Sequence, residues 1–299
     1  KIAKVFGLLK FNLQMLATAR KFNPDIFLSH GSMYAAQVAW ILKKPHISFE
    51  DTFNFEQIRI YKPFTNAILT GAYKHPFVGN RDVNYNGYHE LAYLHPRIFE
   101  PDIQVKKMLA LGEDEKYAIL RFVAWEATHD KNHSGISFKN KLKAVQQFSQ
   151  FCKVFITSEQ QLPSELADYK IPLDPSKMHD ALAGASLYFG ESATMASEAA
   201  CLGTPAIYLD DAGRLYTDEL EEKYGLCFNY SESDQDQLRA IEKGSEILAQ
   251  YDHNKWRDKR EQLLSDKIDV TAFLVWFIQK WPESFEIMKK NPQYQERFK

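Results

Sequence analysis

The sequence predicts an α/β protein with two domains, each built on a parallel sheet between helices. Short apolar, β-prone runs alternate with helical patterns almost throughout the 299 residues, an alternation typical of parallel sheets covered by helices. The periodicity stops in 74–102, a stretch rich in Tyr, His, Gly and Pro, and then resumes. The chain is long enough for two ordinary domains, and we place their junction in this stretch.

The first domain is predicted to span residues 1–102. Its helices are expected at 4–21 and 33–42, and its strands at 25–29, 46–49 and 66–70. The chain opens directly in a helical pattern, whereas an α/β domain usually begins with a strand. We therefore expect that the first strand of this domain is missing from the sequence.

The second domain is predicted to span residues 103–270, followed by a terminal helical segment at 271–299. Its strands are expected at 117–123, 154–157, 187–189, 206–209 and 225–229. Its helices are expected at 139–151, 175–185, 216–224 and from Ser233 onward, and 252–290 is helical and rich in aromatic residues.

Composition excludes several classes of protein. The net charge is −2, so nothing global favours nucleic acid or an anionic membrane as a partner. The three cysteines, Cys152, Cys201 and Cys227, are widely spaced in apolar surroundings, which favours reduced thiols in a cytoplasmic protein. No signal peptide is visible, and no segment reaches the ~20 apolar residues of a membrane span.

The run 187–208 is the most informative segment, because it reads as strand, tight turn, helix and strand. Ser192 and Thr194 can cap the helix, and Gly203 ends it. The turn leaves free backbone N–H groups at the amino terminus of the helix, which is the positive end of the helix dipole. These groups point above the sheet, where they could bind a phosphate. Glu198 lies about one turn further in, where a carboxylate could bind both hydroxyls of a ribose. The local pattern also fits an ordinary α/β turn.

Polar residues follow other predicted strands as well. Ser29–Ser32, with His30, opens one helix, and Glu50–Thr52 follows the next strand. Histidine and carboxylate at one sheet edge suit acid–base chemistry. His30 could instead bond a neighbouring carbonyl, and Glu50 with Asp51 could form a helix N-cap pair.

A polar loop follows the first strand of the second domain. It contains the candidate phosphate or cleft residues Glu126, His129, Asp130, His133, Ser134 and Gly135. His129 and His133 are four residues apart, but no thiolate or third ligand is evident, so we predict no metal site. The junction carries His89, Glu90 and His95, which we predict to border the hinge and cleft rather than to act as plain linker.

Aromatic residues recur at helical spacing near the end of the chain. They are Phe273, Trp276, Phe277, Trp281 and Phe285. We interpret them as the core-facing side of a terminal helix. A peripheral membrane contact, with Lys280, Lys289 and Lys290 beside the aromatics, is the less favoured alternative.

Four segments taken together resemble the domain-of-unknown-function 354 family of bacteria and archaea, often found in surface-polysaccharide contexts. They read HGSMYAAQVAWILKKPHISFEDT, GYHELAYLHPRIFEPD, RFVAWEATHD followed by HSGIS, and ATMASEAACLGTPAI. That family is similar to GT-B-fold glycosyltransferases and UDP-N-acetylglucosamine 2-epimerases. The resemblance implies a GT-B-like fold, with two Rossmann-like domains facing across a cleft and the last helix crossing back to the first domain.

The resemblance also implies roles for individual residues. The turn Glu191, Ser192, Ala193 and Thr194 would hold a diphosphate and Glu198 a ribose. The loop 126–135 would border the phosphates. His30 and Glu50 would face the sugar or acceptor as catalytic residues.

Departures from the epimerase pattern shift the predicted chemistry toward group transfer. Epimerases of this fold carry Asp where this chain has Ser32, and a His-Arg pair where it has Trp125-Glu126; Glu50 alone fits their proton-transfer set. We therefore predict a metal-independent glycosyltransferase for surface polysaccharide or glycan synthesis. It would use no cofactor, a UDP-linked sugar as donor and a glycan or lipid-linked acceptor. A nucleotide-sugar 2-epimerase or hydrolase and a non-catalytic nucleotide-sugar-binding protein are the alternatives.

Overall fold

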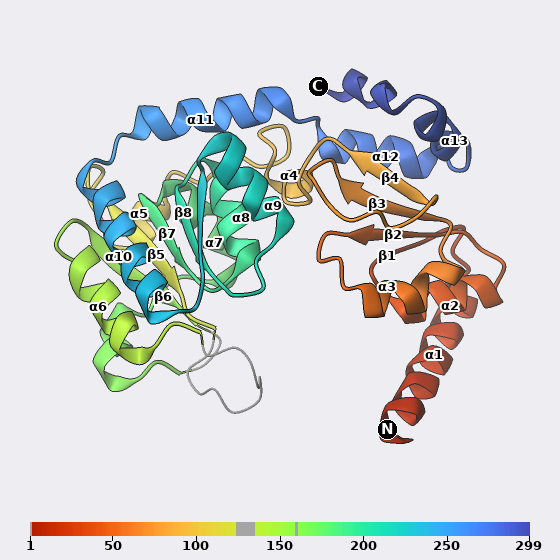
Figure 1. Ribbon diagram of the computed structural model, residues 1–299, viewed down its shortest axis with the longest axis horizontal. Helices are drawn as coiled ribbons and strands as arrows, with labels where there is room; N and C mark the ends of the chain where they lie inside the picture. Colours follow the sequence, from red (N-terminus) through yellow and green to blue (C-terminus); the bar gives the residue numbers. More distant parts are fainter. Residues whose placement is uncertain (1, 124–134, 159–160) are drawn as a thin grey trace. The chain divides into compact units, whose positions relative to one another are not determined.

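The computed structural model describes residues 2–123, 135–158 and 161–299, with side chains from residue 9 onward. The chain forms two compact units (Figure 1). Unit 1 comprises residues 1–89 and 268–299, and unit 2 comprises residues 90–267. Each contains one parallel sheet, so the α/β class predicted from the alternating pattern is confirmed.

Unit 1 has a four-stranded sheet in the order β1-β2-β3-β4. Its strands are β1 (Phe27–His30), β2 (His46–Glu50), β3 (Ala67–Gly71) and β4 (Asp82–Tyr85). Its helices are α1 (Ile2–Phe22), α2 (Met33–Ile41), α3 (Phe55–Tyr61), α12 (Val270–Gln279) and α13 (Glu283–Lys290), with 3-10 turns η1 (Lys62–Phe64) and η5 (Pro292–Phe298). The sequence did not predict β4 or α3.

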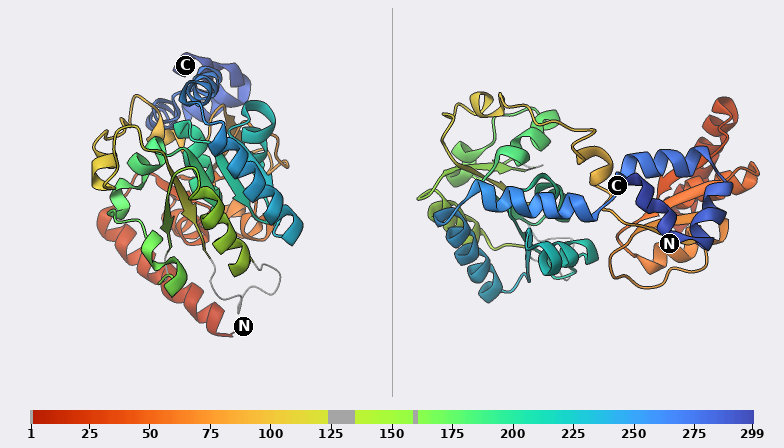
Figure 2. Two further views of the ribbon diagram at one scale, coloured as in Figure 1. Left: turned by 90° about the vertical axis from the view of Figure 1, so that its left-hand side faces the viewer. Right: turned by 90° about the horizontal axis from the view of Figure 1, so that it is seen from above.

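Helix α1 packs on α2, where Met15, Leu16 and Ala19 join a small apolar cluster with Val38 and Ala39. Figures 1 and 2 show the rest of α1 extending beyond α2. None of the described helices is long and apolar enough to cross a membrane.

The terminal aromatic residues contribute to the core of unit 1. Phe273 and Phe277 are fully buried, and the Phe273 ring stacks on Tyr85 of β4 at 6.0 Å between centroids. Trp276 stacks on Tyr294 at 4.9 Å. These contacts favour the core interpretation of the aromatic series over a membrane-facing surface.

Unit 2 has a five-stranded sheet in the order β6-β5-β7-β8-β9. Its strands are β5 (Tyr117–Arg121), β6 (Lys153–Thr157), β7 (Leu187–Gly190), β8 (Ala206–Leu209) and β9 (Cys227–Tyr230). Its α-helices are α4 (Leu91–Leu94), α5 (Val105–Met108), α6 (Phe138–Phe148), α7 (Met178–Gly184), α8 (Ala193–Leu202), α9 (Leu215–Glu219), α10 (Asp234–Ala249) and α11 (His253–Asp266). It also has the 3-10 helices η2 (Ser164–Tyr169) and η3 (Pro175–Lys177) and the π-helix η4 (Leu220–Tyr224). Helices α6 and α10 cover one face of the sheet, and α7 and α8 cover the other (Figure 1).

The division between the units differs from the predicted domain boundaries at 102 and 270. Residues 90–102 belong to unit 2, because α4 packs on α8 and the Asp102 N–H donates to Asp180 Oδ1 at 2.8 Å. Ile268 and the residues after it belong to unit 1, where the Ile268 N–H donates to the Asn86 carbonyl at 2.9 Å.

His46 is a fully buried polar residue at the start of β2. Its Nε2 contacts Ser29 Oγ and its Nδ1 contacts Thr65 Oγ1, both at 2.9 Å. Two hydroxyls can satisfy a neutral ring, with one nitrogen donating and the other accepting. Burial lowers the pKa of His46 from 6.5 to about 4, so the folded state favours the neutral form.

We expect the protein to lose stability in acid partly through His46. Because its folded pKa lies below its unfolded value, its contribution is present above pH 6.5 and is lost as the pH falls toward 4. The loss corresponds to about 3 kcal/mol in full. Denaturant unfolding of wild type and His46→Gln at pH 7.5 and 4.5 tests this: the variant should show the smaller pH dependence. Equal pH dependence in both proteins would contradict the assignment.

Candidate functional site

The carboxyl ends of β1 and β2 bring a histidine and a carboxylate together in unit 1. His30 is the last residue of β1 and Asp51 directly follows β2. His30 Nε2 lies 3.2 Å from Asp51 Oδ1, and the two side chains are 45% and 24% exposed. Burial raises the pKa of Asp51, but the hydrogen bond and charge of His30 outweigh it and lower the pKa overall. The pair can therefore orient the imidazole and hold a charge on it.

The turn after His30 depends on the glycine that follows. Gly31 has φ of +62°, a left-handed conformation that glycine adopts without steric cost. Its N–H donates to Ser48 Oγ at 3.1 Å, and Ser32 caps α2 by accepting the Ala35 N–H at 3.3 Å. The sequence therefore folds this segment as strand, turn and capped helix, with His30 at the bend.

His89 lies beside this pair. Its ring is 5.5 Å from the rings of both His30 and Phe49, measured between centroids. Burial, and then the charge of His30, lower the pKa of His89. Its Nδ1 is buried without a hydrogen-bond partner among the described residues. The predicted hinge residue therefore sits at the carboxyl edge of the unit 1 sheet, next to the residue predicted as catalytic.

Glu50 uses both carboxylate oxygens to hold the turn after β2. Oε1 accepts the backbone N–H groups of Thr52 and Phe53 at 3.1 and 2.8 Å. Oε2 accepts the Tyr61 hydroxyl at 2.6 Å. Glu50 is only 6% exposed. This geometry favours a positioning role for Glu50 rather than the predicted catalytic one. The helix N-cap is Asn54, not the Glu50–Asp51 pair considered from the sequence.

The strand order of unit 2 reverses between β5 and β7, which are neighbours in the sheet while β6 lies outside β5. Ligands of open parallel sheets bind outside the carboxyl ends of the strands at such a switch point. Gly190 ends β7 there, and a Cβ on it would lie 2.3 Å from the Arg121 carbonyl oxygen of β5. Only glycine permits the two strand ends to approach this closely.

Glu191 anchors the chain on either side of the loop that follows β5. Its carboxylate accepts the Val123 N–H at 2.6 Å and the Ile136 N–H at 2.5 Å. Lys141 Nζ lies 3.7 Å away, and the two side chains are 7% and 3% exposed. Burial lowers the pKa of Lys141, although Glu191 opposes the shift. Glu191, predicted to contact nucleotide, is thus engaged with the protein groups of Val123, Ile136 and Lys141.

The amino terminus of α8 has the capped geometry that the sequence predicted. Ser192 Oγ accepts the Met195 N–H at 3.4 Å, and Gly203 ends the helix in a left-handed conformation. Ala193 and Thr194 occupy the first helical positions, whose N–H groups have no partner within a helix. Thr194 is exposed. These donors and the helix dipole together suit an anion.

Glu198 is held in place by two residues of unit 2. His179 Nε2 contacts its Oε1 at 2.9 Å, and the Tyr93 hydroxyl donates to the same oxygen at 3.0 Å. The hydrogen bond that the His179 ring donates to Glu198 raises the pKa of His179, against the effect of burial. Both contacts fall on Oε1, so Oε2 keeps capacity for further donors. Side chains of a helix lean toward its amino terminus, which directs this carboxylate back toward the Ser192 turn.

The remaining predicted residues are distributed as follows. Glu126, His129, Asp130, His133 and Ser134 lie outside the described residues. The Gly135 N–H donates to Glu232 at 2.8 Å. Glu90 is buried at the start of α4. His95 ends that helix, and its Nδ1 accepts the Arg97 N–H at 3.3 Å. Among the described residues no group of three or more His, Cys, Asp or Glu is arranged to hold a metal ion.

Sequence reasoning missed the partners of two site residues. His179 and Tyr93 were not singled out, although Tyr93 lies within the segment 87–102 that the resemblance highlighted. Asp51 was predicted only as part of the polar segment 50–52 or of a helix cap, and its contact with His30 was not predicted. Its pairing with His30 follows from the parallel register of β1 and β2, in which His30 aligns with Phe49.

Comparison with known proteins identifies the fold. No protein-family model and no curated protein sequence matches the chain, so the resemblance to the domain-of-unknown-function 354 family stays a prediction. Solved structures do match, and the chain spans most of their length. The S. aureus MnaA–UDP co-structure is 13% identical with a TM-score of 0.63 over 95% of this chain and 82% of that one.

Two further structures give the same result. UDP-N-acetylglucosamine 2-epimerase from Rickettsia bellii is 14% identical, with a TM-score of 0.61 over 96% of this chain and 81% of that one. MurG from Acinetobacter baumannii is 14% identical, with a TM-score of 0.56 over 92% and 80%. These matches confirm the GT-B-like fold predicted from the sequence. At such identities they establish the fold and leave the activity open.

The Glu191–Lys141 pair provides a test of the geometry after β5 and β7. Glu191→Gln removes the carboxylate that faces the buried Lys141 ammonium, which should lower the free energy of unfolding by about 3–5 kcal/mol. Lys141→Met on that background should restore part of the loss, because the double variant no longer buries the ammonium that Glu191 faced. Denaturant unfolding of the two single variants and the double variant measures the coupling. Additive effects would show that the two groups do not interact.

Proposed function

We propose that the protein is a nucleotide-sugar-dependent glycosyltransferase that works without a metal ion. The observation that carries this proposal is the arrangement at the switch point of unit 2. There α8 has a capped amino terminus, and the same helix carries Glu198, whose carboxylate is held by His179 and Tyr93. The fold, shared with the nucleotide-sugar epimerases and MurG above, supports the same class of substrate.

In this proposal the nucleotide diphosphate binds at the start of α8. The N–H groups of Ala193 and Thr194, the Ser192 turn and the helix dipole stabilise the phosphate charge. Glu198 accepts hydrogen bonds from both ribose hydroxyls, for which Oε2 is available. Glu198 is six positions after Ser192, roughly 9 Å along the helix axis, a spacing that suits a nucleotide lying along the first turns of α8.

The acceptor hydroxyl loses its proton to His30. Because Asp51 contacts Nε2, it favours the tautomer with the proton on that nitrogen and the lone pair on Nδ1. Nδ1 takes the acceptor proton, the acceptor oxygen bonds to the anomeric carbon, and the bond from that carbon to the diphosphate breaks. The diphosphate leaves with the electron pair, and the donors at α8 stabilise its developing charge.

The geometry of Glu50 favours transfer over epimerisation. Glu50 is the one residue that fits the proton-transfer set of the epimerases, and both of its oxygens are occupied by Thr52, Phe53 and Tyr61. A general base needs an oxygen within reach of the substrate proton. A UDP-linked donor and a glycan or lipid-linked acceptor complete the proposal.

A thermal-shift screen with UDP-, GDP- and CMP-sugars tests the donor site. A ligand at a hundredfold excess over its Kd should stabilise the protein by about 2.7 kcal/mol. Glu198→Ala should abolish most of the shift, and His179→Gln, which keeps a donor for Oε1, should retain it. The exposed Glu242 on α10 supplies a matched control, Glu242→Gln. A shift that survives Glu198→Ala would refute the ribose assignment.

Transfer assays test the base. His30→Gln should lower kcat/KM by about 10²–10⁴-fold, the usual contribution of a general base. Asp51→Asn should lower it less and add little to the His30 variant, because the two residues act as one unit. Asp114→Asn, at an exposed site, is the control. Incorporation of solvent deuterium at C2 of the sugar without an acceptor would instead identify an epimerase.

A further inference from the structure

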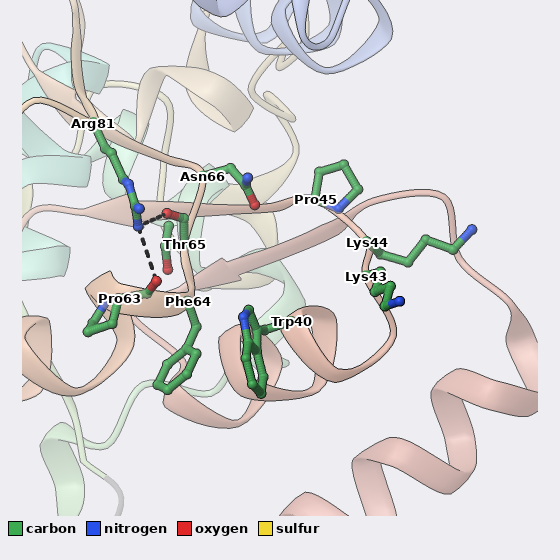
Figure 3. A pocket seen from close by; sticks show the side chains of 9 residues that line it. All are labelled: Trp40, Lys43, Lys44, Pro45, Pro63, Phe64, Thr65, Asn66 and Arg81. Atoms are coloured by element: carbon green, nitrogen blue, oxygen red, sulfur yellow. Dashed lines mark hydrogen bonds between the residues drawn. The ribbon is translucent and has the colours of Figure 1, made fainter.

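A hollow lies on unit 1 (Figure 3). Its lining residues come from the end of α2 and the loop after it, from η1 and the residues after it, and from the loop before β4. Its volume is about 480 Å³, within the range of small-molecule sites. Its lining comprises Trp40, Lys43, Lys44, Pro45, Pro63, Phe64, Thr65, Asn66 and Arg81. None of these residues belongs to the candidate site described above.

The hollow lies at the opposite end of the sheet from His30 and Asp51. Pro45 immediately precedes β2, Asn66 precedes β3 and Arg81 precedes β4. Since the strands are parallel, these positions share the amino-terminal edge, whereas His30 and Asp51 lie at the carboxyl edge. A ligand in the hollow would therefore be distinct from the acceptor proposed for His30.

Two aromatic rings form one wall. Trp40 and Phe64 lie side by side (Figure 3) with ring centroids 5.6 Å apart and an interplanar angle of 65°. Trp40 is 64% exposed, an unusual exposure for the largest apolar side chain. An exposed indole offers a flat face on which a ring of similar size can pack.

Positive charge borders the same space. Arg81 Nη1 donates to the carbonyls of Lys62, Pro63 and Thr65 at 2.6, 3.3 and 2.5 Å, which fixes the guanidinium while it caps the 3-10 turn η1. Lys44 Nζ lies 3.7 Å from Asp25 Oδ1, but that carboxylate is fully exposed and screens it weakly. Lys43 is also exposed. A held guanidinium and two lysines favour an anionic group.

We propose that this hollow binds a saccharide ring that carries a carboxylate or phosphate group. The ring packs on Trp40, and the anion lies toward Lys43, Lys44 and Arg81. The concave shape and limited volume favour one such ring over a membrane surface, which requires a flat or convex apolar face. The site would let the protein hold an acidic glycan or respond to a sugar phosphate, whatever reaction the carboxyl edge supports.

Four small probes separate the contributions of ring and charge. Glucuronic acid and glucose 6-phosphate have both, glucose has only the ring, and inorganic phosphate has only the charge. We expect the first two to bind at least about fivefold more tightly than the others in ligand-observed NMR titrations. Equal affinity for inorganic phosphate and glucose 6-phosphate would overturn the proposal, since it would indicate a site for a bare anion.

Variants assign the binding to this hollow. Trp40→Leu should remove the preference for a ring, and Lys43→Gly with Lys44→Gln should weaken the charged sugars about tenfold. Lys43 has φ of +56°, a conformation that glycine adopts more readily, so this variant should fold at least as well as wild type. Lys21→Gln and Phe77→Ala alter an exposed lysine and an exposed aromatic elsewhere on unit 1 and serve as controls.

Two further outcomes are decisive. Glu198→Ala should leave the affinity for glucose 6-phosphate unchanged, because the proposed nucleotide site lies in unit 2. A loss of affinity in this variant would place the bound probe at the nucleotide site and overturn the proposal. Sedimentation with phosphatidylserine vesicles should show no binding that depends on Trp40. Vesicle binding lost in Trp40→Leu would replace the saccharide site by a lipid surface.

Discussion

The parallel direction of the strands is the constraint on which both candidate sites depend. Every adjacent pair of strands runs parallel, from β1–β2 in unit 1 to β8–β9 in unit 2. Parallel neighbours require a crossover, usually through a helix, so a strand end leads into a turn and a helix amino terminus. β1 leads through Gly31 into α2, and β7 leads through Glu191 into α8. The candidate site residues gather at this edge because the topology repeats the same turn there.

A carboxylate with little solvent exposure stabilises each of these edges, and the residue that follows it in sequence belongs to a candidate site. Glu50 accepts two backbone N–H groups of its own turn, and Glu191 accepts two from the chain around the loop after β5. The residue after Glu50, Asp51, contacts His30. The residue after Glu191, Ser192, caps α8. A carboxylate that accepts several N–H groups is held firmly in one position. If it moved away, each of these buried N–H donors would lose its hydrogen-bond partner, which costs free energy. These contacts favour a positioning role for Glu50 and Glu191, and the roles predicted for them as catalyst and nucleotide ligand stay predictions.

The sequence predicted most elements because alternating apolar runs and capping residues are local signals. Ser192 and Ser233 cap helices where the pattern placed them. Strand β4 was not predicted, because it has four residues, of which Asp82 and Asn84 are polar. The hydrogen-bond partners of Glu198 were not predicted for a different reason. His179 and Tyr93 are 19 and 105 residues away in the sequence, so no local spacing reveals them. Motif analysis found the carboxylate, and only the fold shows what orients it.

Polar side chains on one face of the unit 1 sheet hold the turn that carries His30. Register places Ser29, Ser48 and Glu50 on the same face, where a buried parallel sheet would ordinarily carry apolar residues. Each of these groups has a partner: Ser29 contacts His46, Ser48 accepts the Gly31 N–H, and Glu50 accepts the Tyr61 hydroxyl. Buried polar groups are costly unless paired, so the pairing selects one arrangement of the turn. Ser29 Oγ also accepts the Ser32 N–H, which ties the two residues that flank His30 and Gly31. These polar residues bury less apolar surface than aliphatic side chains would, but their hydrogen bonds fix the backbone that carries the His30 imidazole.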